Sequence, residues 1–328
     1  MKYGLIGNPL SQSFSPLIHE ALGSAPYELH PLSPEELEPF LLEHNFLGIN
    51  VTIPYKQAVL PYLSEIDAAS ARIGAVNTIL VRPDGSLAGY NTDYDGMKYA
   101  LKHAGIDPAG KKALILGSGG TSRTARTLLH DLGASEIVIV SRRKATALAL
   151  PEAPETAASH SVLMKTQADS GSASGIEKAP ADSGCASTAS ETSKSDSFGT
   201  HEEIPVTMTD YEHVRIDHAD AQIIINTTPV GMTPGNGRTP LDLTSFKDLC
   251  GVADVIYNPL RTAFIMQAEE LGIPCTGGLL MLVAQAKAAA EYFLERKIPD
   301  SEIDLIYRDR SEERRVGKEC RSRWSPYH

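Results

Sequence analysis

The sequence predicts an α/β protein, and two observations carry this prediction. Short apolar, strand-like runs alternate with helix-like segments along most of the 328 residues. A glycine-rich turn at residues 117–120 also stands between a strand-like run and a helix-like segment, as nucleotide-binding domains require. Because the length suffices for two domains, we expect an α/β domain at residues 1–101 and a doubly wound, Rossmann-type nucleotide-binding domain at 102–278.

The N-terminal region is predicted to combine strands with helices. Strands are expected at residues 3–6, 46–53, 75–81 and 87–91. A Pro-Asp-Gly sequence at residues 83–85 favours a tight turn that makes the last two strands an antiparallel hairpin. Ser15 before Pro16 indicates a helix start with Ser15 as its cap, and Ser33 before Pro34 repeats the pattern.

The downstream region is predicted to contain a parallel sheet. Strands are expected at residues 112–116, 137–140, 222–225 and 251–256. These runs are mainly apolar, as is typical of parallel strands that are buried on both faces. A helix is expected at residues 121–132, ending at Gly133, and a second helix, rich in Ala and Leu, at 278–296.

Two segments interrupt this pattern. Residues 151–203 are dominated by Ser, Ala, Thr, Glu and Asp, hold no periodicity, and are predicted to be a disordered insertion in the nucleotide-binding domain. Such an insertion can be a surface loop, because lengthening a loop costs little closure entropy. A regulatory segment is the alternative. Residues 308–328 change to dense Arg and Glu and resemble translated vector or adaptor sequence, so we expect them to be non-native.

Composition excludes several classes of function. The net charge of −11 argues against a nucleic-acid or anionic-membrane partner. The four cysteines contain no CxxC spacing, and the ten histidines show no metal-ligand spacing, so neither a disulfide framework nor a metal site is expected. The chain begins directly on a strand-like run, with no signal peptide and no apolar run of about 18 residues, which predicts a cytoplasmic protein.

The glycine turn is the candidate site for a dinucleotide. Its expected cofactor-binding residues are Gly117, Ser118, Gly119, Gly120 and Thr121. Backbone N–H groups at a helix N-terminus bind a pyrophosphate, and glycines let the backbone approach it closely. Ser122 stands where the third glycine of the usual fingerprint would be, and an ordinary strand-to-helix turn remains the alternative.

The end of the next strand indicates which dinucleotide binds. A site for NAD usually offers an acid there to the ribose, whereas a site for NADP offers arginine to the 2′-phosphate. Ser141, Arg142 and Arg143 stand at this position, with no acid. Arginine binds phosphate through two parallel hydrogen bonds, so the segment favours NADP; a solvated basic turn is the alternative.

Lys56 and Asp93 are the candidate acid/base pair. Each follows a strand-like run, and lysine can transfer protons near neutral pH when burial or neighbouring cations lower its pKa. A surface lysine and a helix-capping aspartate are the structural alternatives. Two serines, Ser13 and Ser15, beside a helix N-terminus suit a carboxylate, although simple helix capping would also explain them.

Uncharged polar residues complete the candidate substrate site. Thr52 and Asn77 could offer hydrogen bonds to a polyhydroxy substrate, and each alone would more simply be structural.

Taken together, the motifs resemble those of the shikimate dehydrogenase family. They cover most of the chain except the insertion and the tail, and they stand in the family's order. The matching motifs are SFSP at residues 13–16, NVTIPYK at 50–56, GAVNT at 74–78, NTD at 91–93, the glycine turn, NTTPVGM at 226–232, DVIYNP at 254–259 and GGLLMLVAQ at 277–285.

The resemblance implies the reversible, NADP-linked interconversion of 3-dehydroshikimate and shikimate on the route to aromatic amino acids. It implies that Lys56 is the acid/base, positioned with Asp93. The implied carboxylate-binding residues are Ser13, Ser15 and Tyr257, and the implied ring-hydroxyl partners are Thr52, Asn77, Asp93 and Gln285. The nicotinamide would lie near Val255, Gly278 and Met281.

The resemblance also implies that the N-terminal domain binds substrate, with an active-site cleft between the two domains. A C-terminal helix at residues 279–307 would pack back onto the N-terminal domain and close it. One departure concerns the cofactor: the family usually has Asn-Arg-Thr or Asn-Arg-Ser where this chain has Ser141-Arg142-Arg143, which keeps the phosphate partner but puts the adenine-side contacts in doubt.

Two other functions stay open at this point. A quinate/shikimate dehydrogenase using NAD is one, although the basic segment after the second nucleotide-domain strand disfavours NAD. A non-catalytic, NADP-binding regulator on the same fold is the other, although a sensor would need neither Lys56 nor Asp93. The only expected partner besides cofactor is the small-molecule substrate, and the protein is expected to be a monomer or homodimer.

Overall fold

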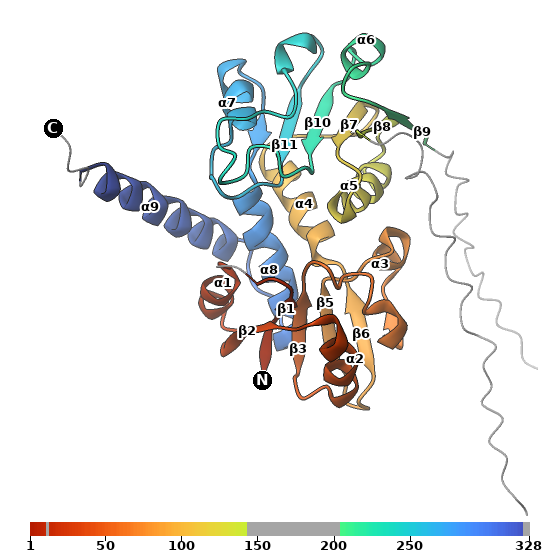
Figure 1. Ribbon diagram of the computed structural model, residues 1–328, viewed down its shortest axis with the longest axis vertical. Helices are drawn as coiled ribbons and strands as arrows, with labels where there is room; N and C mark the ends of the chain where they lie inside the picture. The colour runs from red at the N-terminus through yellow and green to blue at the C-terminus, as the bar shows by residue number, and fades with distance from the viewer. Residues whose placement is uncertain (11–12, 143–203, 324–328) are drawn as a thin grey trace, which may run out of the picture. The chain divides into compact units, whose positions relative to one another are not determined.

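The computed structural model describes residues 1–10, 13–142 and 204–323, with side chains up to residue 312 (Figure 1). It is an α/β structure built on two sheets, which confirms the predicted fold class. The expected disordered insertion at 151–203 lies outside the described residues, as do Arg143 and the last five residues of the expected non-native tail.

The first sheet is mixed. Its order is β2-β1-β3-β5-β6-β4, in which β3, β5 and β6 pair antiparallel and the other neighbours pair parallel. The strands are β1 (Tyr3–Gly7), β2 (Tyr27–Pro31), β3 (Gly48–Val51), β4 (Glu65–Ile66), β5 (Thr78–Val81) and β6 (Leu87–Tyr90). The helices of this region are α1 (Ser15–Ala21), α2 (Pro34–Glu43), η1 (Leu60–Tyr62), α3 (Ala68–Ile73) and α4 (Thr92–His103). The predicted hairpin is therefore present, as β5 and β6.

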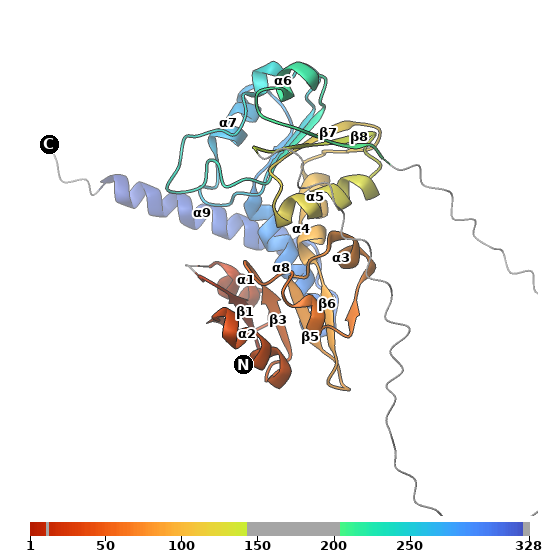
Figure 2. The same ribbon diagram turned by 45° about the vertical axis from the view of Figure 1, so that its right-hand side comes forward.

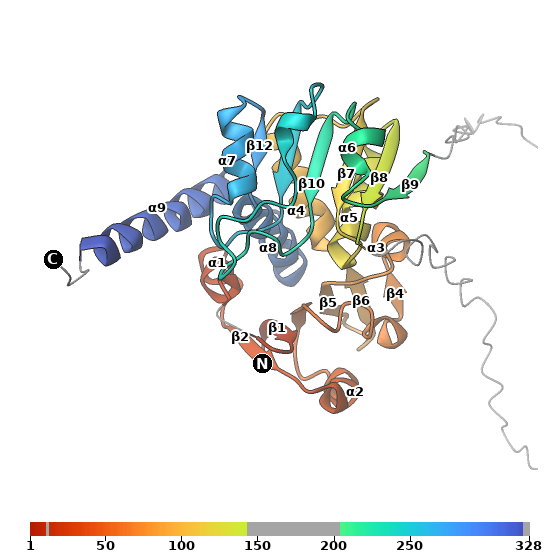
Figure 3. The same cartoon turned by 45° about the horizontal axis from the view of Figure 1, so that its top comes forward.

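The second sheet is parallel in every described pair and has the order β12-β11-β10-β7-β8-β9 (Figure 3). Its strands are β7 (Lys112–Leu116), β8 (Glu136–Val140), β9 (Val206–Thr209), β10 (Ile223–Asn226), β11 (Gly251–Asp254) and β12 (Cys275–Thr276). The remaining helices are α5 (Gly120–Asp131), α6 (Val214–Asp217), η2 (Leu243–Ser245), α7 (Ala263–Glu270), α8 (Gly278–Leu294) and α9 (Ser301–Arg323).

Apolar side chains cover both faces of the second sheet. On one face, Leu114 and Val252 pack with Phe264 of α7 and Val214 of α6. On the other face, Ile115 packs among side chains of α4 and α5. Burial on both faces explains why these strands are apolar runs without alternation, and it makes the sheet doubly wound.

The long helix α8 joins several parts of the structure. It packs along α4, as two views show, and it also contacts α1, α9 and two strands of the first sheet (Figure 1, Figure 2). Phe293 near its end stacks on Tyr3 of β1 with ring centroids 5.0 Å apart. The helix therefore carries residues from the carboxyl edge of the second sheet to the face of the first.

Most predicted boundaries are correct to within a few residues, and one predicted cap is wrong. Ser15 is the first residue of α1, and Phe14 is the N-cap without a side-chain hydrogen bond. The Ser15 amide instead donates to Ser13 Oγ at 3.1 Å, so Ser13 provides the hydroxyl that meets this helix end. Ser33 is a cap as predicted, with a full capping box to Glu36.

No helix in the described part of the chain is both long enough and apolar enough to span a bilayer.

Candidate active site

Lys56 and Asp93 form a close ion pair. Lys56 lies in the turn after β3, and Asp93 is the second residue of α4, directly after β6. Lys56 Nζ donates to Asp93 Oδ2 at 2.5 Å, and the two side chains are only 25% and 15% exposed. The two residues proposed as an acid/base pair from their positions in the sequence are therefore in direct contact.

Asn77 fixes the other oxygen of this carboxylate. It follows α3, at the start of β5, and is buried. Its Nδ2 donates to Asp93 Oδ1 at 2.9 Å, while its Oδ1 accepts from the Thr92 amide at 2.7 Å. Asp93 thus has one oxygen held by Asn77 and one by Lys56, which limits its rotation and sets the direction of the lysine.

Gln285 reaches the same cluster from α8. It is 9% exposed, and its Oε1 lies 3.4 Å from Thr92 Oγ1. Its Nε2 donates to the Leu282 carbonyl at 3.0 Å. Gly96 of α4 allows this approach, because a Cβ at Gly96 would lie 2.8 Å from Gln285 Cβ. Close packing of α4 and α8 therefore places Gln285 beside residues nearly 200 positions earlier in the chain.

A buried polar chain lies beneath the ion pair, and the sequence did not predict it. Asn50 Nδ2 donates to Thr78 Oγ1 at 2.9 Å, and Thr78 Oγ1 is 3.1 Å from Thr92 Oγ1. All three side chains are buried. The signal was available in part, since polar residues at buried strand positions need partners, but a single sequence does not show which partners they find.

The two serines lie close together beside an aromatic contact. Ser13 Oγ donates to Ser15 Oγ at 3.0 Å, and Ser15 is buried. The ring of Phe14 between them meets Tyr257 edge to face, with centroids 6.1 Å apart. The predicted carboxylate-binding residues Ser13, Ser15 and Tyr257 therefore gather in one neighbourhood.

Thr52 occupies the turn that leads from β3 to Lys56. Its amide donates to the Ile6 carbonyl at 2.9 Å, and its carbonyl accepts from the Tyr55 amide at 2.9 Å. Tyr55 is buried, with its hydroxyl on the Leu32 carbonyl at 2.6 Å. These bonds hold the backbone that leads to Lys56, and the Lys56 carbonyl accepts from the Val76 amide at 2.8 Å, so the turn is fixed independently of the ion pair.

The glycine turn forms a backbone surface at the carboxyl edge of the second sheet. Gly117 has φ +105°, which favours glycine, and a Cβ there would meet Thr227 Oγ1 at 3.0 Å. Gly119 is the N-cap of α5, and as a glycine it has no side chain that could cap the first amides of the helix. A Cβ at Gly119 or Gly120 would meet no atom within 4 Å. The space beside Gly119 and Gly120 at the start of α5 is therefore open, and the turn fits a pyrophosphate.

The basic segment adjoins this turn. Ser118 Oγ lies 3.2 Å from Ser141 Oγ, which joins the glycine turn to the end of β8. Ser141 is buried and the next residue, Arg142, is exposed. An exposed guanidinium one residue beyond the strand that flanks a dinucleotide turn fits a ribose 2′-phosphate.

The start of α8 is packed against the end of β11. The Gly278 amide donates to the Ile256 carbonyl at 3.0 Å, and a Cβ at Gly278 would overlap the carbonyl of Val255. Met281, one turn further along α8, is half-buried. The residues that the family resemblance assigns to the nicotinamide therefore lie together at the carboxyl edge of the second sheet.

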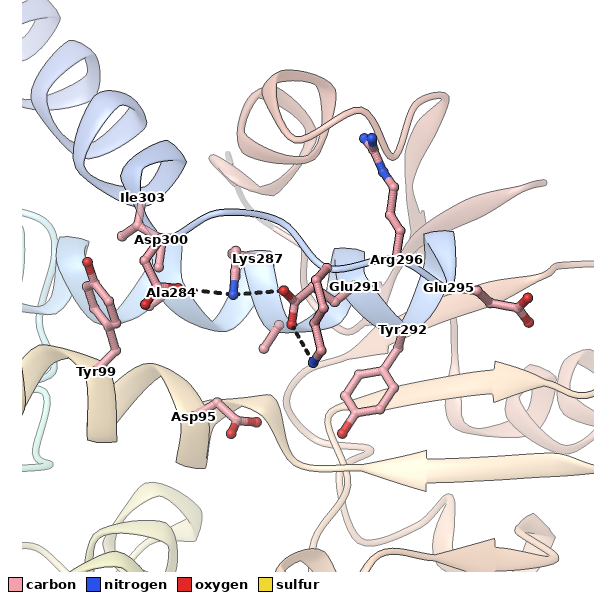
Figure 4. A pocket seen from close by; sticks show the side chains of 12 residues that line it. Asp95, Tyr99, Ala284, Lys287, Glu291, Tyr292, Glu295, Arg296, Asp300 and Ile303 are labelled. Atoms are coloured by element: carbon pink, nitrogen blue, oxygen red, sulfur yellow. Dashed lines mark hydrogen bonds and ion pairs between the residues drawn. The ribbon is translucent and has the colours of Figure 1, made fainter.

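A separate pocket of about 390 Å³ lies along another face of α8 (Figure 4). Lys287 stands between Glu291 Oε1 at 2.8 Å and Asp300 Oδ1 at 3.1 Å, and Glu291 also accepts from Lys297 at 3.3 Å. None of the predicted site residues lines this pocket. Because its central charges neutralise one another, we assign it a structural role that ties α8 to the start of α9.

Replacing Lys287 with Met is expected to lower the free energy of unfolding by about 1 kcal/mol, since the pair with Glu291 is largely shielded from water. Lys297→Met is the matched control, because Lys297 pairs with the same carboxylate but is 92% exposed. Urea denaturation should show a smaller loss for the control, and kcat should be unchanged in both variants. Equal losses of unfolding free energy in the two variants would contradict the argument that burial strengthens the Lys287–Glu291 pair.

Comparisons with known proteins agree with this arrangement. Residues 5–79 match the family model described as "Shikimate dehydrogenase substrate binding domain". A curated relative from Moorella thermoacetica, named shikimate dehydrogenase (NADP(+)), is 33% identical over 313 residues, covering 93% of this chain and 92% of the relative.

Solved structures give the same result. Shikimate dehydrogenase 1 from Peptoclostridium difficile matches with a TM-score of 0.68 and 31% identity, over 94% of this chain and 97% of that one. Shikimate 5-dehydrogenase from Thermus thermophilus, solved in complex with NADP(H) and shikimate, matches with a TM-score of 0.69 and 28% identity, over 94% and 99% of the two chains. The chain therefore belongs to the shikimate dehydrogenase family.

Proposed function

We propose that this protein is an NADP-dependent shikimate dehydrogenase that reversibly reduces 3-dehydroshikimate to shikimate. The observation that carries the proposal is the contact of Lys56 Nζ with Asp93 Oδ2, held by Asn77, in a chain of this family. Curated relatives bear the name shikimate dehydrogenase (NADP(+)), which supports NADP as the cofactor.

In the proposed mechanism, Lys56 is the general acid in the reduction and the general base in the reverse reaction. When bound, NADPH supplies the hydride that reduces the ring ketone. As negative charge grows on the ketone oxygen, Lys56 Nζ donates a proton to it, and Asp93 keeps the ammonium group aimed at that oxygen. In the reverse direction, Lys56 removes the proton from the substrate hydroxyl. Positioned acid/base groups of this kind contribute roughly 10²–10⁴-fold to the rate.

Substrate orientation is proposed to depend on two groups of side chains. Ser13, Ser15 and Tyr257 bind the carboxylate at one end, and the edge-to-face contact of Phe14 with Tyr257 supports their common location. Asn77 and Gln285, which already reach the Asp93 cluster, bind ring hydroxyls together with Thr52. Such fixed, uncharged donors discriminate against compounds that lack a hydroxyl, because the buried polar groups would then be unpaired.

The cofactor is proposed to bind along the carboxyl edge of the second sheet. The amides at Gly119 and Gly120 hold the pyrophosphate, with Ser118 and Thr121 beside them. Arg142 pairs with the 2′-phosphate next to Ser141. Val255 and Gly278 bound the nicotinamide end. The open space above Gly119 and Gly120 supports this assignment.

Arg142→Ala is expected to raise KM for NADP⁺ by roughly tenfold or more, because one charge-assisted phosphate contact is lost. KM for NAD⁺ should be nearly unchanged, since NAD⁺ lacks the 2′-phosphate. Steady-state kinetics with both cofactors measures this directly. Arg215→Ala, which removes an exposed arginine of α6, is the charge control, and an equal rise of KM for NADP⁺ in both variants would contradict a specific contact.

We also propose the domain division on functional grounds. Residues 1–101 form the substrate-binding and catalytic domain, and residues 102–278 form the NADP-binding domain. The single closing helix predicted at 279–307 is instead two helices, α8 (Gly278–Leu294) and α9 (Ser301–Arg323), and α9 continues into the expected tail. The family match over residues 5–79 and the packing of α8 on α4 support this division. The cytoplasmic location, the non-native tail and the choice between monomer and homodimer stay predictions.

The deciding experiment measures NADPH formation from shikimate and NADP⁺, with quinate and NAD⁺ as parallel controls. Turnover only with shikimate and NADP⁺ would establish the proposed activity. Comparable turnover with quinate or NAD⁺ would instead identify a quinate/shikimate dehydrogenase of broader specificity. Binding of NADP⁺ without turnover of either acid would identify a regulator.

A further inference from the structure

Asp254 is a buried acid at the carboxyl end of β11 to which no catalytic role has been given. It is 2% exposed, and the donors to its carboxylate are uncharged. Oδ1 accepts from Asn226 Nδ2 at 3.0 Å and from the Ile256 amide at 3.1 Å, and Oδ2 accepts from Thr262 Oγ1 at 2.6 Å. Three donors directed at one carboxylate each favour its ionised form.

Burial raises the pKa of Asp254 to about 6, in opposition to the hydrogen bonds from Thr262, Ile256 and Asn226, which lower it. Most of the population is therefore ionised at neutral pH. Among the described residues, the donors to this buried negative charge are neutral dipoles, which suggests a use for the charge itself.

The position of this charge indicates what that use is. Val255 follows Asp254 directly, and its amide donates to the Asn226 carbonyl at 3.1 Å. The next residue, Ile256, accepts from Gly278 at the start of α8. The carboxylate therefore belongs to the residue that directly precedes the backbone segment proposed to contact the nicotinamide, and it accepts from the Ile256 amide of that segment.

The same network extends to the glycine turn. Asn226 Oδ1 accepts from the amide and the hydroxyl of Thr228 at 3.0 and 2.7 Å. Thr228 in turn lies against Gly117, where a Cβ would meet its Cγ2 at 3.0 Å. The Asp254 carboxylate is thus connected, through Asn226 and Thr228, to the glycine turn where the dinucleotide is proposed to bind.

We propose that the Asp254 carboxylate stabilises the oxidised cofactor, NADP⁺, relative to NADPH. This inference rests on the proposed function, which places the nicotinamide beside Val255. Loss of a hydride leaves the nicotinamide ring positively charged, and a fixed negative charge in a weakly polar surrounding attracts it. NADPH has a neutral ring and gains nothing from that charge, so the effect is specific to one redox state.

Asp254→Asn tests the charge with little change of shape. The asparagine Oδ1 can still accept from Asn226 and Ile256, and its Nδ2 can donate to Thr262 Oγ1. We expect the dissociation constant of NADP⁺ to rise about tenfold and that of NADPH to change less than about twofold, as an attraction to only one of the two forms requires. NADPH fluorescence titration and calorimetry with NADP⁺ measure the two constants without any substrate.

Two further variants test whether the charge is responsible. Thr262→Val removes the hydrogen bond that most lowers the pKa of Asp254, so it should reduce the ionised fraction and weaken NADP⁺ more than NADPH, in the same direction as Asp254→Asn. Asp242→Asn removes an exposed negative charge near η2 and should leave the ratio of the two constants unchanged. If Asp254→Asn fails to fold, Asp254→Ser supplies a second neutral variant for the same titrations.

The outcomes are distinguishable. A wild-type ratio of the two constants in folded, neutral variants of Asp254 would overturn the inference while leaving the proposed function intact. Binding of neither cofactor form by the wild-type protein would overturn the proposed function itself. A selective loss of NADP⁺ affinity would support the inference even before any turnover is measured.

Discussion

Lys56→Ala is expected to lower kcat for shikimate oxidation by roughly 10²–10⁴-fold, whereas KM for shikimate should change much less. The variant removes the group that exchanges a proton with the reacting oxygen, but Asn77 still holds Asp93 at 2.9 Å. The rest of the substrate site therefore keeps its geometry. Initial rates over a range of shikimate concentrations, with saturating NADP⁺, separate the two parameters.

Lys98→Ala is the matched control for this experiment. Lys98 is exposed on α4, the helix that also carries Asp93, so its removal tests the general effect of losing a lysine there. Both variants should unfold within a few degrees of the wild type, because partly exposed ion pairs contribute about 0–1 kcal/mol to stability. Near-normal kcat for Lys56→Ala would refute the proposed role, and an equally large loss for Lys98→Ala would show that the effect is not specific.

Much of the fold could be predicted because hydrophobic pattern and local turn chemistry act over short distances. The strands of the second sheet are apolar runs, since both of their faces are covered, and β7 begins and ends where predicted. The capping box at Ser33 is equally local. The prediction of Ser15 as a cap was wrong for the opposite reason: two serines stand next to one helix start, and only the path of the backbone decides which hydroxyl meets it.

The candidate site was predictable as a set of residue types but not as a set of contacts. Lys56 and Asp93 are 37 positions apart, and their ion pair depends on the pairing of β3, β5 and β6. Thr92 stood inside a recognised motif, yet its contact with Asn77 arises only when β5 pairs with β6, and its contact with Gln285 only when α4 packs on α8. The roles assigned to these residues stay predictions until variants are measured.

Asp254 illustrates a second limit of the sequence. Its motif was recognised, but an aspartate at the end of an apolar strand could equally face solvent. The three neutral donors that surround it come from β10, from its own loop and from the start of α7. Only the fold brings them together, so neither its burial nor its raised pKa could be derived from local pattern.

Gly278→Ala is expected to lower the free energy of unfolding by about 1–3 kcal/mol or more, because the new Cβ would overlap the backbone of Val255. A flexible side chain could move aside, but a carbonyl at the end of a central strand cannot move without displacing the strand or α8. Thermal unfolding should show a melting temperature lower by several degrees. NADP⁺ binding should weaken as well, since the displaced atoms border the proposed nicotinamide site.

Gly120→Ala is the control that separates the two effects, because Gly120 is also the first residue of a helix with glycine as its N-cap. A Cβ at Gly120 meets no atom within 4 Å, so stability should be nearly unchanged. That open space is where the pyrophosphate is proposed to lie, so NADP⁺ affinity should still fall. Equal stability losses in the two variants would contradict the packing argument, and unchanged NADP⁺ affinity in Gly120→Ala would remove the glycine turn from the proposed cofactor site.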